Sequence, residues 1–488
     1  MKYLTFILLL ALTSCSSLPP TTIDSDEIKI NHGVVVTSTI SNIDALSRFN
    51  KDWTEVVIYS IPELDDESQI YSLQKYTQEE TGNSYFYGQV PVGRYNFGLL
   101  YSHYNDGSRQ SWVSMPAGFS AFEFSVKDNE ISDLGLFIYQ PLQLSNRAQE
   151  RSDDEELKKG FITHVDSKNS RFIDKIKIKH GLSNLDITDI SFPEIPIQLN
   201  QQLTKLSKRY FWKTNLIKLN NDNSELVALG KLGQYSLKSG SSWINYSIPS
   251  NDEILNISFI NNTYYIATKN GTVYSTPSLK APSKTFKPIK FGQPILWFGG
   301  NNNELYSLTK DELYTYCYQK INNEKWTEIG RFEKSFRLGK DPTTTAIIDS
   351  EGQLQVYLDG DLYQYKKTWK RSHSENFEKF FQQNENIYSA IVDGILIDDD
   401  VWISKNKGRD WKSFPRDFHF YNRKLSSSPP LLLKDGRVIS LGNLYSVPNK
   451  RKRDTMTLSE NIVLMQTPYE AKEKISPSDW QFFSNVNP

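Results

Sequence analysis

The sequence predicts an all-β protein, because strand-forming residues dominate its composition and short strand patterns recur along its length. Among 488 residues there are 27 Tyr, 26 Phe and 10 Trp, an aromatic content that is typical of strands. Aromatic strand segments also return at a regular interval in the C-terminal part. We expect a small N-terminal β-sandwich, a linker, and a larger domain of repeated β units.

The first residues have the features of a bacterial export signal. One lysine precedes an apolar run over residues 3–12, which has the length of a secretory hydrophobic core and is shorter than the roughly 20 residues that span a bilayer. The sequence Leu-Thr-Ser-Cys that ends at Cys15 resembles the bacterial lipobox, in which the cysteine thiol receives a diacylglyceryl group. The resemblance implies a lipoprotein signal peptide over residues 1–14, lipid attachment at Cys15 and a tether over residues 15–26. The alternative is a secreted protein with an incidental cysteine.

The residue after the lipobox indicates which membrane the anchor reaches. Ser16 stands there instead of aspartate, which favours the outer membrane of a Gram-negative cell. Several acyl chains anchor a protein stably, whereas a single chain does so only marginally. We therefore expect the membrane to be one partner, reached through the N-terminal lipid, on either the periplasmic or the surface face.

The charge and the cysteine content give no support to a nucleic-acid-binding protein or to a protein stabilised by an intramolecular disulfide. Without residues 1–14 the chain keeps 55 basic and 57 acidic side chains, a balance that gives no indication of nucleic-acid binding. With Cys15 lipidated, Cys317 is the one remaining cysteine, so no intramolecular disulfide can form. Its strand-like surroundings predict a buried core thiol.

Residues 27–140 read as short strands separated by turns. A turn at Pro91-Val92-Gly93 separates two aromatic strand patterns, because proline sets φ and glycine accepts unusual backbone angles. This turn, with the run that begins Phe-Ser-Val-Lys-Asp-Asn at Phe124, resembles the closing strands of prealbumin-like (transthyretin-like) β-sandwiches found after the anchor of bacterial lipoproteins. The resemblance implies a spacer or a docking module for a partner.

Residues 141–204 differ in composition and are predicted to be a linker. The run over 149–159 is rich in charge and poor in strand formers, which predicts a short solvated helix capped by Ser152. Lys and Ile alternate over 175–179, which predicts an exposed strand.

Residues 205–488 contain two aromatic markers that share one period. The first marker lies at the centre of a short strand, at Tyr235, Tyr274, Tyr314, Tyr363, Trp402 and Tyr445, with intervals of 39, 40, 49, 39 and 43 residues. The second follows it at Trp243, Phe286, Trp326, Trp369 and Trp411, with intervals of 43, 40, 43 and 42 residues. A period of this length with several strands per unit is typical of the blades of a β-propeller.

Turn pairs inside the repeats, such as Asn270-Gly271 and Asp435-Gly436, favour hairpins over helical repeats. Six blades can be counted, and pairing of residues 461–465 or 480–483 with 211–219 would close a seventh. We therefore expect a six- or seven-bladed propeller after the sandwich.

Two segments resemble the Asp-box (BNR repeat) of sialidase-like and sortilin-like propellers, Ser-x-Asp-x-Gly-x-Thr-Trp. The better copy has Ser404, Asn406, Gly408, Asp410 and Trp411 at the consensus positions, with Asn and Asp replacing Asp and Thr. Short polar side chains at these positions can bond to the hairpin backbone, and the tryptophan can fill the space between strands.

The second, degenerate copy has Ser236, Gly240 and Trp243 at the same spacing, with Lys238 in place of Asp. In the families that carry it the motif lies away from the active site. The resemblance therefore implies a fold and assigns these residues a structural role.

Neither a catalytic site nor a metal site can be recognised. A sialidase-like glycan hydrolase needs an arginine cluster, a nucleophile and an acid, but the arginines at 209, 331, 371, 409 and 437 follow no recognisable order. The six histidines are scattered without metal-binding spacing. We expect no enzyme activity, no metal and no cofactor.

The sequence therefore predicts a membrane-anchored lipoprotein whose non-catalytic propeller binds a protein, peptide or glycan partner, or assists assembly, in the cell envelope. Propellers collect loops from every blade, which suits large partners. A sialidase-like glycan hydrolase and a surface adhesin remain as alternatives.

Overall fold

The structure is a computed structural model of the whole chain. It describes residues 21–23, 28–41, 53–62, 67–76, 83–105, 107–108, 110–117, 122–141, 160–165, 168–192, 198, 201–202, 213–218, 226–230, 232–240, 242–282, 285–291, 293–301, 304–311, 313–321, 325–333, 344–348, 352–358, 361–373, 379–382, 388–392, 400–406, 410–415, 417–418, 423–425, 431–433, 435–445, 458–465 and 480–485.

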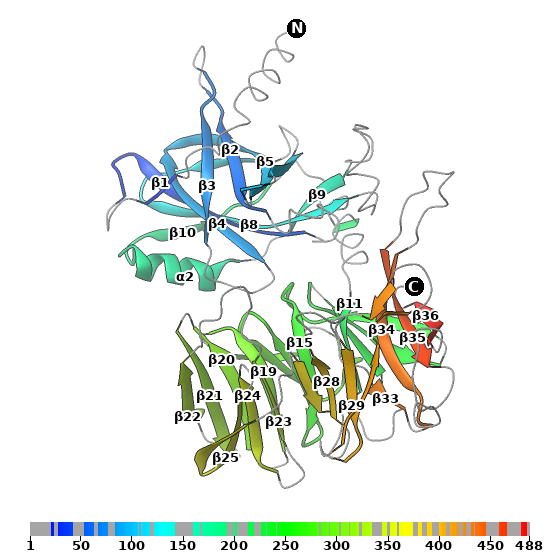
Figure 1. Cartoon of the computed structure of the whole chain (residues 1–488). Coiled ribbons are helices and arrows are strands. Elements are labelled where there is room, and N and C mark those ends of the chain that lie inside the picture. Colours follow the sequence, from blue (N-terminus) through cyan, green and yellow to red (C-terminus); the bar gives the residue numbers. More distant parts are fainter. Residues whose placement is uncertain are drawn as a thin grey trace, which may run out of the picture. The chain divides into compact units, whose positions relative to one another are not determined.

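The chain divides into two compact units, with the boundary between Ser207 and Lys208. Strands dominate both units, which confirms the predicted all-β class (Figure 1). In the described part of the chain, no helix has the length and apolar character that crossing a membrane requires. Cys15 and the predicted helix over 149–159 lie outside the described residues.

The first unit is built on one continuous sheet in the order β10-β8-β1-β4-β3-β2-β5-β6, with β7 beside β5 and β9 beside β8. Its elements are β1 (His32–Ser41), β2 (Glu55–Ser60), β3 (Ile70–Tyr76), β4 (Ser84–Pro91), β5 (Gly93–Asn105), β6 (Gln110–Pro116), β7 (Glu123–Val126), β8 (Glu130–Pro141), β9 (Gly160–Val165), α2 (Ser170–Lys179) and β10 (Asp186–Asp189).

The strand β3 joins the two halves of this sheet. Its first residues pair with β2 and its last residues pair with β4, so strand pairing continues from one half to the other. The predicted β-sandwich stays a prediction. Side chains alternate across β1: Val35 packs into a core with Phe97 and Phe137, whereas Val34 and Val36 face a second core.

Within the segment predicted as a linker (141–204), the described residues 160–165 and 168–192 pack into the first unit, which corrects the expectation for them. The strand β9 pairs antiparallel with β8 at one end of it, and β10 pairs parallel with the other end. Short strands of mixed polarity give little periodic signal, and their pairing with a distant strand cannot be read from local sequence.

The predicted exposed strand over 175–179 is also wrong, because these residues end the helix α2. Phe172, Ile173 and Ile176 recur at helical spacing and are buried against the sheet, where Phe172 contacts Tyr85 with ring centroids 4.7 Å apart. Over five residues, alternation and helical spacing give similar patterns. Ile178, which the alternation would have placed with Ile176, is 83% exposed.

The second unit consists of consecutive antiparallel sheets, and its described residues form six. The first five have four strands each. The first sheet contains β11 (Lys213–Lys218), β12 (Leu226–Gly230), β13 (Gln234–Ser239) and β14 (Ser242–Ser247), and the second contains β15 (Ile254–Ile260), β16 (Thr263–Thr268), β17 (Thr272–Thr276) and β18 (Lys287–Lys290). The third contains β19 (Ile295–Gly300), β20 (Glu304–Lys310), β21 (Tyr314–Ile321) and β22 (Thr327–Glu333), the fourth β23 (Thr344–Ile348), β24 (Leu354–Leu358), β25 (Asp361–Lys366) and β26 (Thr368–His373), and the fifth β27 (Lys379–Gln382), β28 (Tyr388–Val392), β29 (Asp400–Ser404) and β30 (Lys412–Pro415). The last contains β31 (Asp417–Phe418), β32 (Arg423–Leu425), β33 (Leu431–Leu432), β34 (Val438–Tyr445), β35 (Leu458–Met465) and β36 (Trp480–Asn485).

These sheets form a ring. The first strands of successive sheets contact one another, from β15 to β19, β23 and β27. The ring closes where Ala228 and Trp243 of the first sheet pack with Leu431 and Ile439 of the last. A closed ring of consecutive four-stranded sheets is a β-propeller, which confirms this part of the predicted fold.

Among the described strands, the pairing that would close a seventh blade is not present. The strand β11 pairs with β12, whereas β35 and β36 extend the last sheet from β34. The C-terminal strands therefore add to an existing sheet.

The two aromatic markers have a structural explanation. The first marker lies on the third strand of each of the first five sheets, for example Tyr235 on β13 and Tyr363 on β25. The second lies on the fourth strand or just before it, where its ring reaches the neighbouring sheet: Trp326 packs on Phe291 of the preceding sheet at 4.9 Å. The period thus reports one outer aromatic contact per sheet.

Candidate functional site

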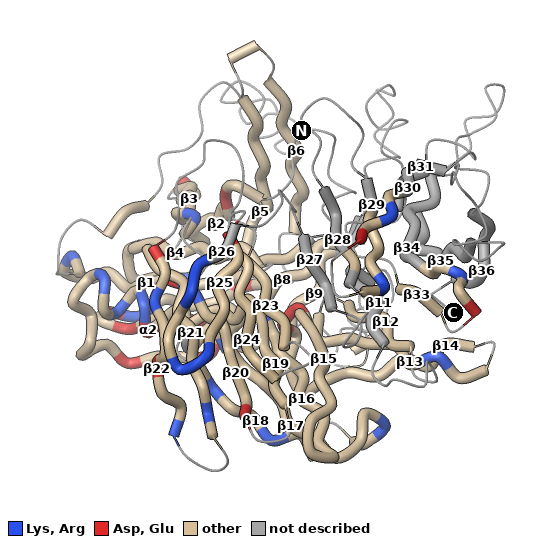
Figure 2. Tube along the Cα trace, turned by 60° about the horizontal axis from the view of Figure 1, so that its bottom comes forward, with Lys and Arg blue, Asp and Glu red and all other residues tan. Residues whose placement is uncertain are grey.

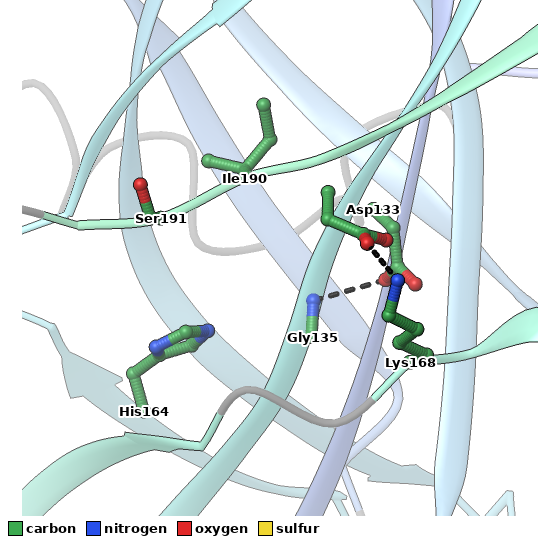
Figure 3. Close-up of a pocket in the computed structure, with 7 residues that line it drawn as sticks. Asp133, Gly135, His164, Lys168, Ile190 and Ser191 are labelled. Carbon is green, nitrogen blue, oxygen red and sulfur yellow. Dashed lines mark hydrogen bonds and ion pairs between the residues drawn. The ribbon is translucent and has the colours of Figure 1, made fainter.

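The first unit contains a cavity of about 280 Å³ beside β8. Figure 3 shows its side chains converging from β8, β9, β10 and the segment before α2. The lining residues are Asp133, Gly135, His164, Lys168, Asp189, Ile190 and Ser191.

A β-bulge in β8 shapes this cavity. Between the pairs Val36–Asp133 and Ser38–Leu136, β8 has one residue more than β1. Gly135 takes a φ of 75° in the bulge, where a side chain would be strained. Its N–H donates to Asp133 Oδ1 at 3.0 Å, and its carbonyl accepts from Thr37 Oγ1 at 3.2 Å.

Asp133 links the bulge to the start of α2. Its Oδ2 accepts from the Asn169 backbone N–H at 2.8 Å, and its Oδ1 accepts from Asn169 Nδ2 at 2.6 Å. Its carbonyl also accepts from the Ile190 N–H at 2.9 Å, beside the end of β10. One buried residue therefore holds a strand, a helix start and an edge strand together.

Burial dominates the electrostatics of Asp133, which is 3% exposed. Burial raises the pKa of its carboxyl, the hydrogen bonds from Asn169 and Gly135 lower it, and the nearby Asp189 charge raises it. The net result is a raised pKa.

The other polar residues of the cavity also have local partners. Lys168 is ion-paired with Asp189 at the exposed rim. His164 is buried, its Nε2 lies 2.8 Å from the Leu134 carbonyl, and its ring packs edge-on against Phe192 at 4.6 Å. The arrangement stabilises the fold around the bulge. Sequence reasoning missed this cluster because its members lie far apart in the chain, partly in the supposed linker.

The better Asp-box copy forms the hairpin between β29 and β30. The buried Ser404 donates from Oγ to Asn406 Oδ1 at 3.0 Å, and the same Oδ1 accepts from the Asp410 backbone N–H at 2.9 Å. Asn406 Nδ2 donates to Asp410 Oδ2 at 2.6 Å. Trp411 is partly buried just before β30, and Gly408 lies outside the described residues. These bonds show how the two polar side chains order the loop.

The degenerate copy differs from the better copy in its strand pairing. Ser236 lies within β13 opposite Asn245, and the strands pair as far as Ser239 and Ser242, with Gly240 at a φ of 59° in the tight turn. Trp243 lies opposite Lys238 and is buried at the closure of the ring. The described strands β13 and β14 pair up to two residues apart, whereas β29 and β30 leave a longer connection, so equal spacing does not produce equal structure.

Three arginines of the propeller each pair with an acidic residue of their own sheet. Arg331 pairs with Glu328 of its own strand at 3.2 Å, and Arg371, in a basic stretch along β26 (Figure 2), pairs with Asp361 at 2.6 Å. Arg437 pairs with Asp435 at 2.6 Å. Arg209 and Arg409 lie outside the described residues. In the described ranges, His, Cys, Asp and Glu form no group of three or more that could hold a metal.

One face of the propeller is cross-linked by backbone hydrogen bonds. It is formed by the turns between second and third strands and by the connections between sheets, and we call it the connection face. In it the connection over 248–253 bonds to both flanking sheets, since Gly233 N–H donates to Asp252 O at 2.8 Å and Lys269 N–H to Glu253 O at 3.0 Å. Lys310 N–H donates to Pro294 O at 3.0 Å in the next connection.

Side chains on the connection face are also held in place. Lys269 pairs with the buried Glu253 at 2.8 Å. The Asp311 carboxylate accepts from the backbone N–H groups of Leu313 at 2.8 Å and Tyr314 at 2.7 Å, which fixes the turn that leaves Leu313 66% exposed. These bonds order the side chains and turns of the connection face.

No family model matches the chain, and no curated protein matches its sequence. Solved structures are similar to it in part. YCF48 from Cyanidioschyzon merolae is 12% identical with a TM-score of 0.33, over 47% of this chain and 93% of that one. TolB from Acinetobacter baumannii is 11% identical with a TM-score of 0.35, over 56% and 63%. A GH74 xyloglucanase from Xanthomonas campestris is 9% identical with a TM-score of 0.34, over 56% and 47%.

Proposed function

We propose that the protein is a lipoprotein of the bacterial outer membrane whose propeller binds a protein or glycan partner of the cell envelope without catalysing a reaction. The observation that carries the binding role is the connection face, where backbone bonds join successive sheets and fix an exposed Leu313. A preorganised surface loses little conformational entropy on binding, so its contacts convert into affinity.

The anchoring role is supported by the sequence around Cys15, with its export signal and lipobox. It is tested with Cys15→Ser in the native host. The variant should leave the membrane fraction and remain folded, because the described strands of both units begin after residue 15. Retention of the variant in the membrane fraction would contradict the anchor.

The binding role is tested by a photo-crosslinking residue placed at Leu313 in the full-length protein. We expect a discrete adduct with an envelope protein or glycan. The matched control is Ile244 on the outer strand β14, which is 45% exposed but lies away from the connection face. Equal labelling from both positions would argue against a specific face, and turnover of fluorogenic glycosides by the purified protein would refute the non-catalytic role.

A further inference from the structure

Exposed aliphatic side chains gather at one end of the first unit's sheet, where β4 ends and β1, β8 and β10 begin. Ile30, just before β1, is 88% exposed, and Val92, between β4 and β5, is 46% exposed. Ile187, the second residue of β10, is 43% exposed. These strands are neighbours in the order β10-β8-β1-β4, so the three side chains share one edge of the unit, which we call the aliphatic end.

The pairing register places these residues at the same level. His32 pairs with Pro91, which sets Ile30 and Val92 beyond the same ends of β1 and β4. Asp186 pairs with Glu130, which sets the start of β10 at the start of β8. A single exposed aliphatic residue needs no explanation, whereas a group at one end points to a contact.

Backbone bonds hold the aliphatic end in its exposed form. His32 N–H donates to Lys29 O at 3.1 Å, which closes the turn that carries Ile30. Val92 N–H donates to Asn31 O at 2.9 Å, and Asn129 N–H donates to His32 O at 3.2 Å. Three turns are thus joined, and Ile30 and Val92 cannot fold inward without breaking these bonds.

We propose that the aliphatic end inserts into the interfacial region of the lipid bilayer that carries the anchor. This inference rests on the proposed lipid attachment at Cys15. Aliphatic residues on a rigid edge gain free energy when they leave water for the acyl boundary. Lys29 and Lys127 flank the end and can extend their amines to the headgroups.

The length of the tether supports the lipid bilayer as the partner of the aliphatic end. Thr21 is docked on the first unit, since its N–H donates to Ser72 O at 2.8 Å on β3. Five residues lie between Cys15 and Thr21, and an extended chain over these six residue steps reaches roughly 20 Å. Thr21 also lies beside Gly88, three residues before Pro91 at the aliphatic end, which is roughly 10 Å along β4. The bilayer therefore lies within reach of this end.

Charge plays a minor part in the contact. Lys127 lies 3.6 Å from Glu130, and the exposed Asp128 and Asp186 lie in the turn before β8 and at the start of β10. Acidic side chains therefore offset the lysines at this end. We therefore expect similar contact with zwitterionic and anionic lipids.

The test uses lipidated full-length protein with Ile30→Cys, labelled with an environment-sensitive fluorophore. The matched control is Trp112→Cys, because Trp112 is 56% exposed in the same unit and lies opposite His103, at the far end of β5. The native Cys317 is buried and stays unlabelled in the folded protein. On phosphatidylcholine vesicles the label at position 30 should shift to the blue and that at position 112 should not. No shift at position 30, or equal shifts at both, would overturn the proposal.

A second measurement separates this contact from the anchor. The acyl-free Cys15→Ser protein should bind phosphatidylcholine vesicles weakly, and adding Ile30→Ser with Val92→Ser should weaken that binding roughly tenfold, from the lost aliphatic burial. Unchanged binding would overturn the inference while leaving the anchor intact. A photo-crosslinker at position 30 should label lipid, and labelling of a protein instead would assign the end to a protein partner and refute it.

Discussion

The indole Nε1 of Trp369 donates a hydrogen bond to the carbonyl of Ile329 at 2.7 Å, across two neighbouring sheets of the propeller. The indole lies over Gly330, where an added Cβ would come within 2.5 Å of Nε1. Its ring also meets Phe332 edge-on at 4.9 Å. The outer aromatic residue of one sheet is therefore fitted to the fourth strand of the sheet before it.

We expect Trp369→Phe to destabilise the propeller by about 1–3 kcal/mol, because it removes the donor, leaves the Ile329 carbonyl without it and reduces packing volume. Gly330→Ala should also destabilise it, by overpacking against the same indole. Calorimetric unfolding measures both. Trp112→Phe, at an exposed site, should change stability by less than about 0.5 kcal/mol, and an equal loss in that control would contradict the role of the contact.

Asp133→Asn should reduce stability and also remove a pH dependence. The new amide places an N–H opposite the Asn169 N–H donor, a mismatch that costs about 1–3 kcal/mol. Burial raises the pKa of the Asp133 carboxyl in the folded protein. Such a group stabilises the fold fully below its unfolded pKa and loses this contribution as pH rises through its folded pKa.

Urea unfolding from pH 3.5 to 7 measures this effect. The stability difference between wild type and Asp133→Asn should be largest at low pH and should narrow as pH rises. If the stability difference instead widens as pH rises, the hydrogen bonds, which lower the pKa of Asp133, would outweigh burial, which raises it.

In the segment predicted as an Asp-box, Asn406 and Asp410 stand where the consensus has Asp and Thr, and the Asn406 amide donates to the Asp410 carboxylate. We expect these two departures from the consensus to compensate for each other. Asn406→Asp alone should place two carboxylates together and destabilise the hairpin by about 1 kcal/mol. Adding Asp410→Thr should restore most of this loss by recreating the consensus pair. A double-mutant cycle from thermal unfolding gives the coupling energy, and additive effects would contradict the compensation.

Cys317 should be inert towards thiol reagents in the folded protein. Its side chain is fully buried in β21, and burial raises the pKa of the thiol, which disfavours the reactive thiolate. In the Cys15→Ser variant, a colourimetric thiol reagent at pH 8 should detect no thiol before unfolding and one thiol per chain in denaturant. Rapid labelling of the folded protein would place Cys317 at the surface.

The repeat could be predicted because each propeller sheet needs aromatic side chains at the same positions to pack against its neighbour. An aromatic residue on the third strand, such as Tyr363, and one on the fourth strand, such as Trp369, recur once per sheet because each sheet packs in the same way. The sequence therefore shows a regular period. The burial of Cys317 followed from its strand pattern for the same reason. The lipid anchor at Cys15, which no described residue tests, stays a proposal from sequence.

The features that sequence reasoning missed depend on partners far along the chain. Nothing local distinguishes Asp133 from any polar strand residue, and its role arises from Asn169 and the bulge in β8. Ser236 has the spacing of an Asp-box residue, but pairing along β13 and β14 leaves no loop for it to order.

The sequence by itself determined the all-β class, the repeat and the position of the outer aromatics, because these follow from local period and burial. Only the tertiary structure decided that residues 160–189 complete the first sheet, that 175–179 are helical, and which carbonyl each buried polar group meets. Strand pairing and helix packing depend on which distant strand has an unpaired edge or an exposed apolar face nearby. The residues next to each other in sequence do not determine this.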